Sequence, residues 1–286
     1  MKKCFIAICV LFIAVQVTLA ETPAAAPNEQ IAKFEANIEK LIVTDHNLSA
    51  ALKEYVDAAK ANPQEVYYRQ QYAVLQRVIK MQTLLTTEMN LEKWKSYAKA
   101  VRGYFYSKGF YSEALPLDLK AANKFDTADY AANVVETMLL TGKTADAAKF
   151  LAGKKPADSS VRYQTLALTV QALDGKAKEA VDALQAVKID PKMDSKSYLD
   201  AARIYNAAGD NAKTLSNLQL LLENTLPSEI AAERIMIAKT ADFAALQTAD
   251  DFKKVVATAS KIQQSSCTGG SNCATCKSRD KCASQK

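Results

Sequence analysis

Four glycines recur at a nearly constant spacing, and this spacing constrains the fold more than any other feature of the chain. The intervals are 33, 33 and 34 residues, and the glycines are Gly109, Gly142, Gly175 and Gly209. Their surroundings are similar strings: SKGFYSEAL, LTGKTADAA, LDGKAKEAV and AAGDNAKTL. A period near 34 residues is typical of stacked helical hairpins, in which each unit buries its apolar face only against its neighbours. Such arrays usually offer a binding surface.

The composition favours helix along nearly the whole chain. Glycine and proline are scarce, at 8 and 7 residues, and apolar residues recur at intervals of three and four rather than in strand-like alternation. The sequence therefore predicts an all-α protein. The first predicted helix begins near Asn28, and another holds Trp94 and leads to Gly109. The remaining predicted helices span residues 48–60, 64–87, 110–124, 128–141, 144–153, 160–173, 176–188, 195–207, 211–223, 228–239 and 250–262.

Each turn glycine lies just after a predicted helix, where a left-handed backbone is wanted and glycine adopts it without strain. Asp126 and Asp194 stand where they could cap the start of the next helix. Trp94 and the tyrosines at 67, 68, 72 and 97 follow helical spacing, so we expect them to pack in the core rather than form a ligand cage.

Residue types also recur at fixed offsets from the glycines. Small residues stand five positions after each one, and these are Ala114, Ala147, Ala180 and Thr214. A second pattern, in SAALKEYVDAAKANPQ, combines Ala51, Tyr55, Ala58 and Pro63. These spacings resemble the tetratricopeptide repeat over about residues 47–240. The chain departs from the family pattern at Arg102, Asp118 and Lys154, where small, aromatic and alanine residues are preferred.

The resemblance implies a right-handed superhelix of antiparallel helix pairs, an α-solenoid whose inner groove is lined by the first helix of each pair. The positions that it places in the groove are Lys99, Tyr106, Glu136, Arg162, Thr165, Thr169, Lys196, Arg203 and Asn206. Within this set, Arg162, Lys196 and Arg203 would form a basic strip suited to a carboxylate or an acidic peptide. The alternative is that they are ordinary solvated charges on a helix face.

The N-terminal segment predicts export. Lys2 and Lys3 precede an apolar run, and small residues follow before Glu21, which is the layout of a signal peptide at 1–20. The alternative, a membrane anchor, needs about 20 apolar residues, and this run is shorter. We expect a disordered leader at 21–27, a helical repeat domain at 28–264 with its clearest repeats at 95–240, and no later membrane span. The exported protein would be periplasmic or secreted.

A cysteine-rich tail occupies residues 265–286. Its cysteines follow the spacing C-x5-C-x2-C-x5-C and are Cys267, Cys273, Cys276 and Cys282. In an exported chain an even number of cysteines predicts disulfides, although four thiolates could also bind a metal and the central C-x2-C could exchange disulfides. Lys277 follows the second cysteine of that pair, where a haem site needs histidine.

No catalytic motif stands out, and we expect a protein that is not an enzyme and has no cofactor. The one histidine, His46, makes a catalytic triad or a multi-histidine metal site improbable. Loss of Lys2 and Lys3 lowers the net charge from +6 to +4, which is too mild to indicate nucleic acid. The sequence thus favours a scaffold that binds a protein or peptide. The alternative is a thiol-redox or metal-binding protein that acts through the tail.

Overall fold

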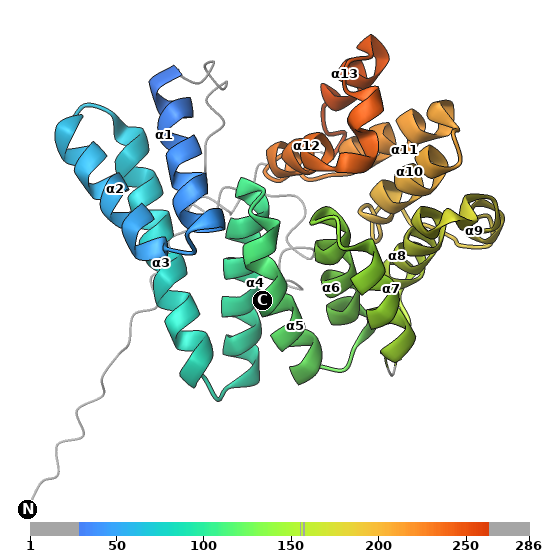
Figure 1. Ribbon diagram of the computed structural model, residues 1–286, viewed down its shortest axis with the longest axis horizontal. Helices are drawn as coiled ribbons and strands as arrows, with labels where there is room; N and C mark the ends of the chain where they lie inside the picture. Colours follow the sequence, from blue (N-terminus) through green and yellow to red (C-terminus); the bar gives the residue numbers. More distant parts are fainter. Residues whose placement is uncertain (1–28, 155, 157, 263–286) are drawn as a thin grey trace, which may run out of the picture.

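The computed structural model describes residues 29–154, 156 and 158–262, and every regular element in these residues is helical (Figure 1). The all-α prediction is confirmed. The elements, with two π-helical segments (η1, η2) and one 3-10 segment (η3), are α1 (Glu29–Glu39), η1 (Lys40–Thr44), α2 (Leu48–Ala61), α3 (Val66–Thr87), α4 (Leu91–Lys108), α5 (Tyr111–Lys124), α6 (Ala128–Leu140), α7 (Thr144–Gly153), α8 (Val161–Gln171), η2 (Ala172–Lys176), α9 (Ala177–Leu184), α10 (Ser197–Ala207), α11 (Asn211–Glu223), α12 (Ile230–Lys239), η3 (Ala241–Leu246) and α13 (Asp250–Val256).

The periodic glycines form the turns that the sequence predicts. Their φ angles are 70°, 72°, 86° and 77° at Gly109, Gly142, Gly175 and Gly209, and they are the glycines with positive φ among the described residues. After Gly109, Gly142 and Gly209 the next backbone N–H donates to the carbonyl five residues earlier, which is the Schellman arrangement for ending a helix. The chain can therefore reverse within one or two residues and form a hairpin.

Successive hairpins pack side by side from α4 to α11. Each helix contacts the next along the chain, and α8 contacts both α6 and α10, the helices two positions away on either side. The helices α6, α8 and α10 therefore form one layer, here called the inner layer, and α7, α9 and α11 each pack against members of it (Figure 1). This is a helical repeat-like arrangement.

The C-terminal helices do not extend this row. Helix α12 packs against α4, and the Lys239 ammonium lies 3.0 Å from the Glu39 carboxylate, so the end of the chain returns to its first third (Figure 1). Met236 and Ile237 of α12 are buried. The last predicted helix, 250–262, is shorter in the structure, because α13 ends at Val256 and packs on α11.

The largest hydrophobic cluster, here called the aromatic core, joins α1–α5 to the C-terminal helices. The predicted packing of the aromatic residues is confirmed: the Trp94 side chain is 1% exposed, Tyr68 is buried, and Tyr67, Tyr72 and Tyr97 pack partly buried against the same cluster. The Trp94 indole N–H also donates to the Leu85 carbonyl at 3.2 Å. Smaller clusters rich in alanine, leucine and valine hold α5–α8 and α8–α10 together.

The two predicted N-caps are wrong. Helix α6 begins after Thr127 and α10 after Lys196. The Asp126 carboxylate instead pairs with Lys154 at 2.7 Å, and Asp194 accepts a long hydrogen bond from the Asp190 N–H in the turn before α10. Both aspartates therefore stabilise contacts outside the helix starts.

The predicted signal peptide (1–20), the leader and the tail with Cys267, Cys273, Cys276 and Cys282 lie outside the described residues. Within the part of the chain that the structure describes, no helix combines the length and the apolarity that crossing a bilayer requires.

Candidate functional site

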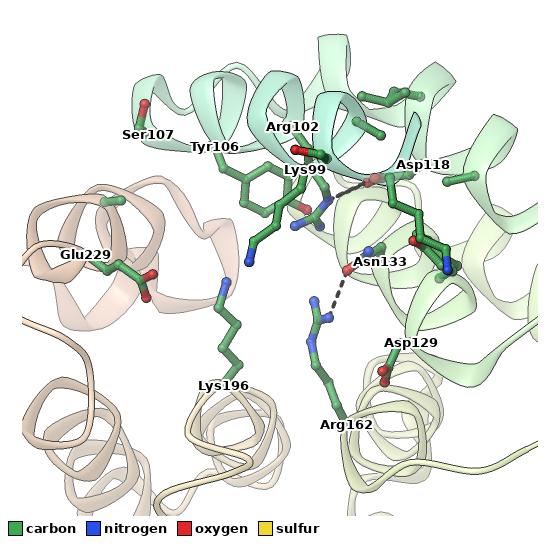
Figure 2. Close-up of a pocket in the computed structure, with 18 of the residues that line it drawn as sticks. Lys99, Arg102, Tyr106, Ser107, Asp118, Asp129, Asn133, Arg162, Lys196 and Glu229 are labelled. Carbon is green, nitrogen blue, oxygen red and sulfur yellow. Dashed lines mark hydrogen bonds and ion pairs between the residues drawn. The ribbon is translucent and has the colours of Figure 1, made fainter. Parts of the chain in front are cut away.

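A cavity of about 1050 Å³, here called the central cavity, lies between α4, α5, α6, α8 and α12 (Figure 2). The repeat itself places part of its lining. The residues thirteen positions before the four turn glycines all line the cavity, and they are Ser96, Asp129, Arg162 and Lys196. The same position in successive repeats thus faces the central cavity, so residues far apart in the sequence meet there.

Two departures from the family pattern compensate each other beside this cavity. The Arg102 Nε lies 2.9 Å from Asp118 Oδ1 and 3.2 Å from Oδ2, so opposite charges replace the expected small and aromatic residues where α4 crosses α5. The Arg102 guanidinium also lies 3.8 Å from the centre of the Tyr106 ring, a cation–π contact. Thr137 donates to Asp118 at 2.6 Å, which leaves the buried carboxylate well supplied with partners.

Glu136 extends these contacts to the next repeat. Arg102 Nη2 from α4 and Arg162 Nη2 from α8 each lie 2.6 Å from Glu136 Oε2, and Arg162 Nη1 donates to Asn133 Oδ1 at 2.8 Å. Burial alone would raise the pKa of the Glu136 carboxyl, but the charges of Arg162 and Arg102 outweigh it and hold that pKa well below its usual range. We call Arg102, Asp118, Glu136 and Arg162 the buried ion network; it joins α4, α5, α6 and α8.

Two lysines project into the cavity without comparable pairing. Figure 2 shows the side chains of Lys99, from α4, and Lys196, just before α10, pointing toward one another across the cavity. Lys99 is exposed and has no ion pair or hydrogen bond within the described part of the chain, and Lys196 Nζ lies 3.6 Å from Glu233 Oε1. Facing ammonium groups repel each other, and an anion between them would relieve that repulsion.

Helix α12 supplies a wall of opposite charge. Glu229 and Glu233, one helical turn apart, both line the cavity, and Figure 2 shows the Glu229 side chain on the same side of it as Lys196. Glu233 is 5% exposed, and burial raises the pKa of its carboxyl although Lys196 opposes this shift. The central cavity therefore has cations on α4, α8 and the start of α10. Its carboxylates lie on α12 and also, as Glu92, Asp118 and Asp129, on α4, α5 and α6.

The predicted groove residues divide into two groups. Lys99, Tyr106, Arg162 and Lys196 line the central cavity, and Glu136 lies beneath its surface as the partner of the arginines. The structure therefore brings together five of the positions that the resemblance selected.

The remaining predicted groove residues are buried or, in the case of Asn206, half-buried, and they contact the protein itself. Thr165 and Thr169 are fully buried, and Thr165 Oγ1 donates to the Asp200 carboxylate at 2.7 Å. Arg203 is 2% exposed and pairs with Asp242 of η3, whose carbonyl also accepts from Asn206 Nδ2 at 2.7 Å. The expected basic strip is therefore interrupted, because the C-terminal segment covers the Arg203 end of the inner layer and neutralises it.

Sequence reasoning missed several residues of this site. Arg102 and Asp118 were visible as two departures of opposite charge on either side of one turn glycine, and this signal could have indicated a pair. Asp129 could have been found from its offset to Gly142. For Glu229 and Glu233 the sequence holds no comparable signal, since the return of α12 to α4 leaves no periodic pattern.

Other chemistry-bearing side chains of the described region lie away from the cavity or do not cluster. His46 Nδ1 lies 2.8 Å from Glu113 Oε1 at the turn before α2, where His46 adopts a φ of 50°. The described residues contain no group of three or more His, Cys, Asp or Glu arranged to hold a metal ion.

Comparison of the chain with protein-family models, curated proteins and solved structures gives no match.

Proposed function

We propose that the protein is a non-enzymatic binding scaffold that holds a peptide or protein segment in the central cavity. We further propose that its hairpins form a tetratricopeptide-like right-handed superhelix. The glycine turns, the spacing of 33 to 34 residues and the contacts of α8 with α6 and α10 support this arrangement. In such an array the side chains of the inner layer line one concave surface that can bind a single partner.

The observation that carries the proposal is the pair of lysines, Lys99 and Lys196, that face each other in the cavity. A carboxylate between them would gain two charge-assisted contacts, and Figure 2 shows Arg162 on the same side of the cavity as Lys196. Binding sites for small ligands typically measure about 300–1,000 Å³. The central cavity, at about 1050 Å³, therefore suits a short segment that carries a carboxylate, such as a chain terminus, rather than a folded domain.

The proposed setting is outside the cytoplasm. The predicted signal peptide would export the chain to the periplasm or the medium, and the cysteine-rich tail would be an appendage locked by disulfides. The partner would then be an exported protein or peptide that meets the array there.

The test uses a pool of acetylated tetrapeptides of random sequence with free C-terminal carboxylates, and the same pool with amidated ends. Full-length protein should retain the carboxylate pool and release the amidated one. Changing Lys99→Ala together with Lys196→Ala should weaken retention about tenfold, because it removes two charge contacts at solvent-accessible side chains, each worth up to about 1 kcal/mol.

The matched control is Lys93→Ala with Lys192→Ala. These lysines belong to the same two segments and carry the same charge, but they are exposed and do not line the cavity. The control should retain peptides as the unaltered protein does. Equal retention by both double variants would contradict the proposal, provided that circular dichroism shows the helices intact.

A further inference from the structure

One atom in the central cavity lacks the partner that burial normally demands. Glu233 is 5% exposed, and its Oε2 has no hydrogen-bond donor among the described residues. Its other oxygen meets only Lys196, at 3.6 Å, which is beyond hydrogen-bond length. Buried polar side-chain atoms nearly always have a partner, and a buried carboxylate without one is costly. The cavity is therefore short of a hydrogen-bond donor at α12.

The surroundings of Glu233 show why the chain itself does not supply that donor. The charges that act on its carboxyl are Lys196 and Arg162, which favour the ionised form, and Glu136 and Glu229, which oppose it. Arg162 is already held by Glu136 and Asn133. Two carboxylates, Glu229 and Glu233, thus face the cavity. The ammonium of Lys196, which lies 3.6 Å from Glu233, is too far away to donate a hydrogen bond to it.

The lysines of the cavity have the opposite shortage, because they lack hydrogen-bond acceptors. Lys99 has no acceptor within the described part of the chain, and Lys196 meets only the Glu233 oxygen at 3.6 Å. One cavity therefore offers unused donors on Lys99 and Lys196 and an unused acceptor on Glu233. A guest that satisfies both must carry an acceptor and a donor at separate places.

We propose that the central cavity selects a dipolar peptide segment, in which a carboxylate is accompanied by a lysine, an arginine or a terminal ammonium. The carboxylate binds between Lys99 and Lys196, and the cationic N–H group donates to Glu233 Oε2. This inference rests on the proposed function and adds the second charge. A purely acidic segment would leave Glu233 without a donor and would be repelled by Glu229 and Glu233, and such repulsion excludes wrong partners.

The tetrapeptide pool with free carboxylates also tests this inference. Peptides retained by full-length protein are identified by mass spectrometry, and those with lysine or arginine should be enriched about tenfold over the input, in line with the strength of close charge pairs. Changing Glu233→Gln removes the charge and keeps the size of the side chain. The enrichment should then fall to about the input level, while peptides without a basic residue are still retained.

The control variant is Glu179→Gln, which makes the same chemical change on the exposed surface of α9 and should keep the enrichment. Retention of carboxylate peptides without enrichment of basic residues would overturn the dipolar inference and leave the scaffold proposal standing. Retention of neither pool would overturn both. Enrichment that persists in the Glu233→Gln variant would show that another group reads the positive charge, and would also contradict the assignment to Glu233.

Discussion

The aromatic core and the buried ion network are both shielded from water, but they hold helices together by different means. The core joins α1–α5 to the C-terminal helices through large apolar side chains such as Trp94 and Phe105. The network joins α4, α5, α6 and α8 through arginines and carboxylates. Apolar burial is non-directional and strongly stabilising, whereas a buried ion pair adds little net stability but requires defined geometry. The comparison indicates that the core stabilises the fold and the network positions the cavity wall.

The largest expected effect is a loss of stability in the aromatic core. Phe105 is fully buried, so Phe105→Ala should lower the free energy of unfolding by about 3–5 kcal/mol through lost apolar burial and the space left behind. Urea titration should show the same loss at pH 5 and pH 8, because no charge is removed. A strong dependence of this loss on pH would break the distinction between the two interiors.

The next effect concerns the centre of the network. Glu136→Gln leaves two largely buried guanidinium groups, those of Arg102 and Arg162, without their shared partner charge. Breaking a buried pair in this way typically costs about 3–5 kcal/mol, and the retained amide oxygen should keep the loss near 3 kcal/mol. Urea titration again measures it, and an unchanged midpoint would show that the network does not hold these helices.

A smaller effect separates pairing from burial. Arg102→Met and Asp118→Leu should each destabilise the protein, yet the double variant should lose less than the sum, with a coupling of about 1–3 kcal/mol. The reason is that Arg102→Met takes away the cation that pairs with Asp118, and Asp118→Leu takes away one of the two carboxylates that pair with Arg102. The double variant removes both charges, and Glu136 keeps its contact with Arg162. Additive losses would mean that the two departures from the repeat pattern do not compensate each other.

The smallest effect, taken over any one pH unit, is a pH dependence of stability next to the network. Burial raises the pKa of Asp200 from 3.8 to about 7, although Thr165 and Arg162 oppose the shift. Between pH 4 and pH 7 the unfolded chain therefore releases a proton that the folded chain keeps, and stability falls as pH rises, by at most about 1.4 kcal/mol per pH unit.

Asp200→Asn should remove this slope, because its amide oxygen can still accept from Thr165 and does not ionise. Thermal unfolding of both proteins from pH 4 to pH 8 makes the comparison. Parallel pH profiles would contradict the assignment of the raised pKa to Asp200.

Much of the fold was readable because the glycines mark the helix ends. The predicted spans 211–223 and 144–153 coincide with α11 and α7, and 110–124 differs from α5 by one residue. The start of each of these helices depends on local chemistry, namely a glycine just before it that takes a left-handed turn. The return of α12 to α4 depends instead on contacts such as Lys239 with Glu39, 200 residues apart, which leave no periodic trace.

The site was readable to the same extent. Lys99, Arg162 and Lys196 were found because a helical repeat fixes which face of each helix points inward. Arg203 belongs to the same inner layer, but η3 covers it and Asp242 neutralises it, and the sequence did not show this. A periodic pattern therefore predicts which side chains share a face, whereas the segment that later covers that face must be seen in the structure.

The central claim is that the ligand binds in the central cavity, between Lys99 and Lys196 and against Glu233 of α12. Lysine acetylation tests this claim most directly. Full-length protein is treated briefly with acetic anhydride with and without the retained tetrapeptides, and modification at each lysine is read by mass spectrometry. The account predicts that the peptides slow acetylation of Lys99 and Lys196 while leaving Lys93 and Lys192 unchanged. Equal rates with and without peptide at Lys99 and Lys196, or protection confined to Lys93 and Lys192, would contradict it.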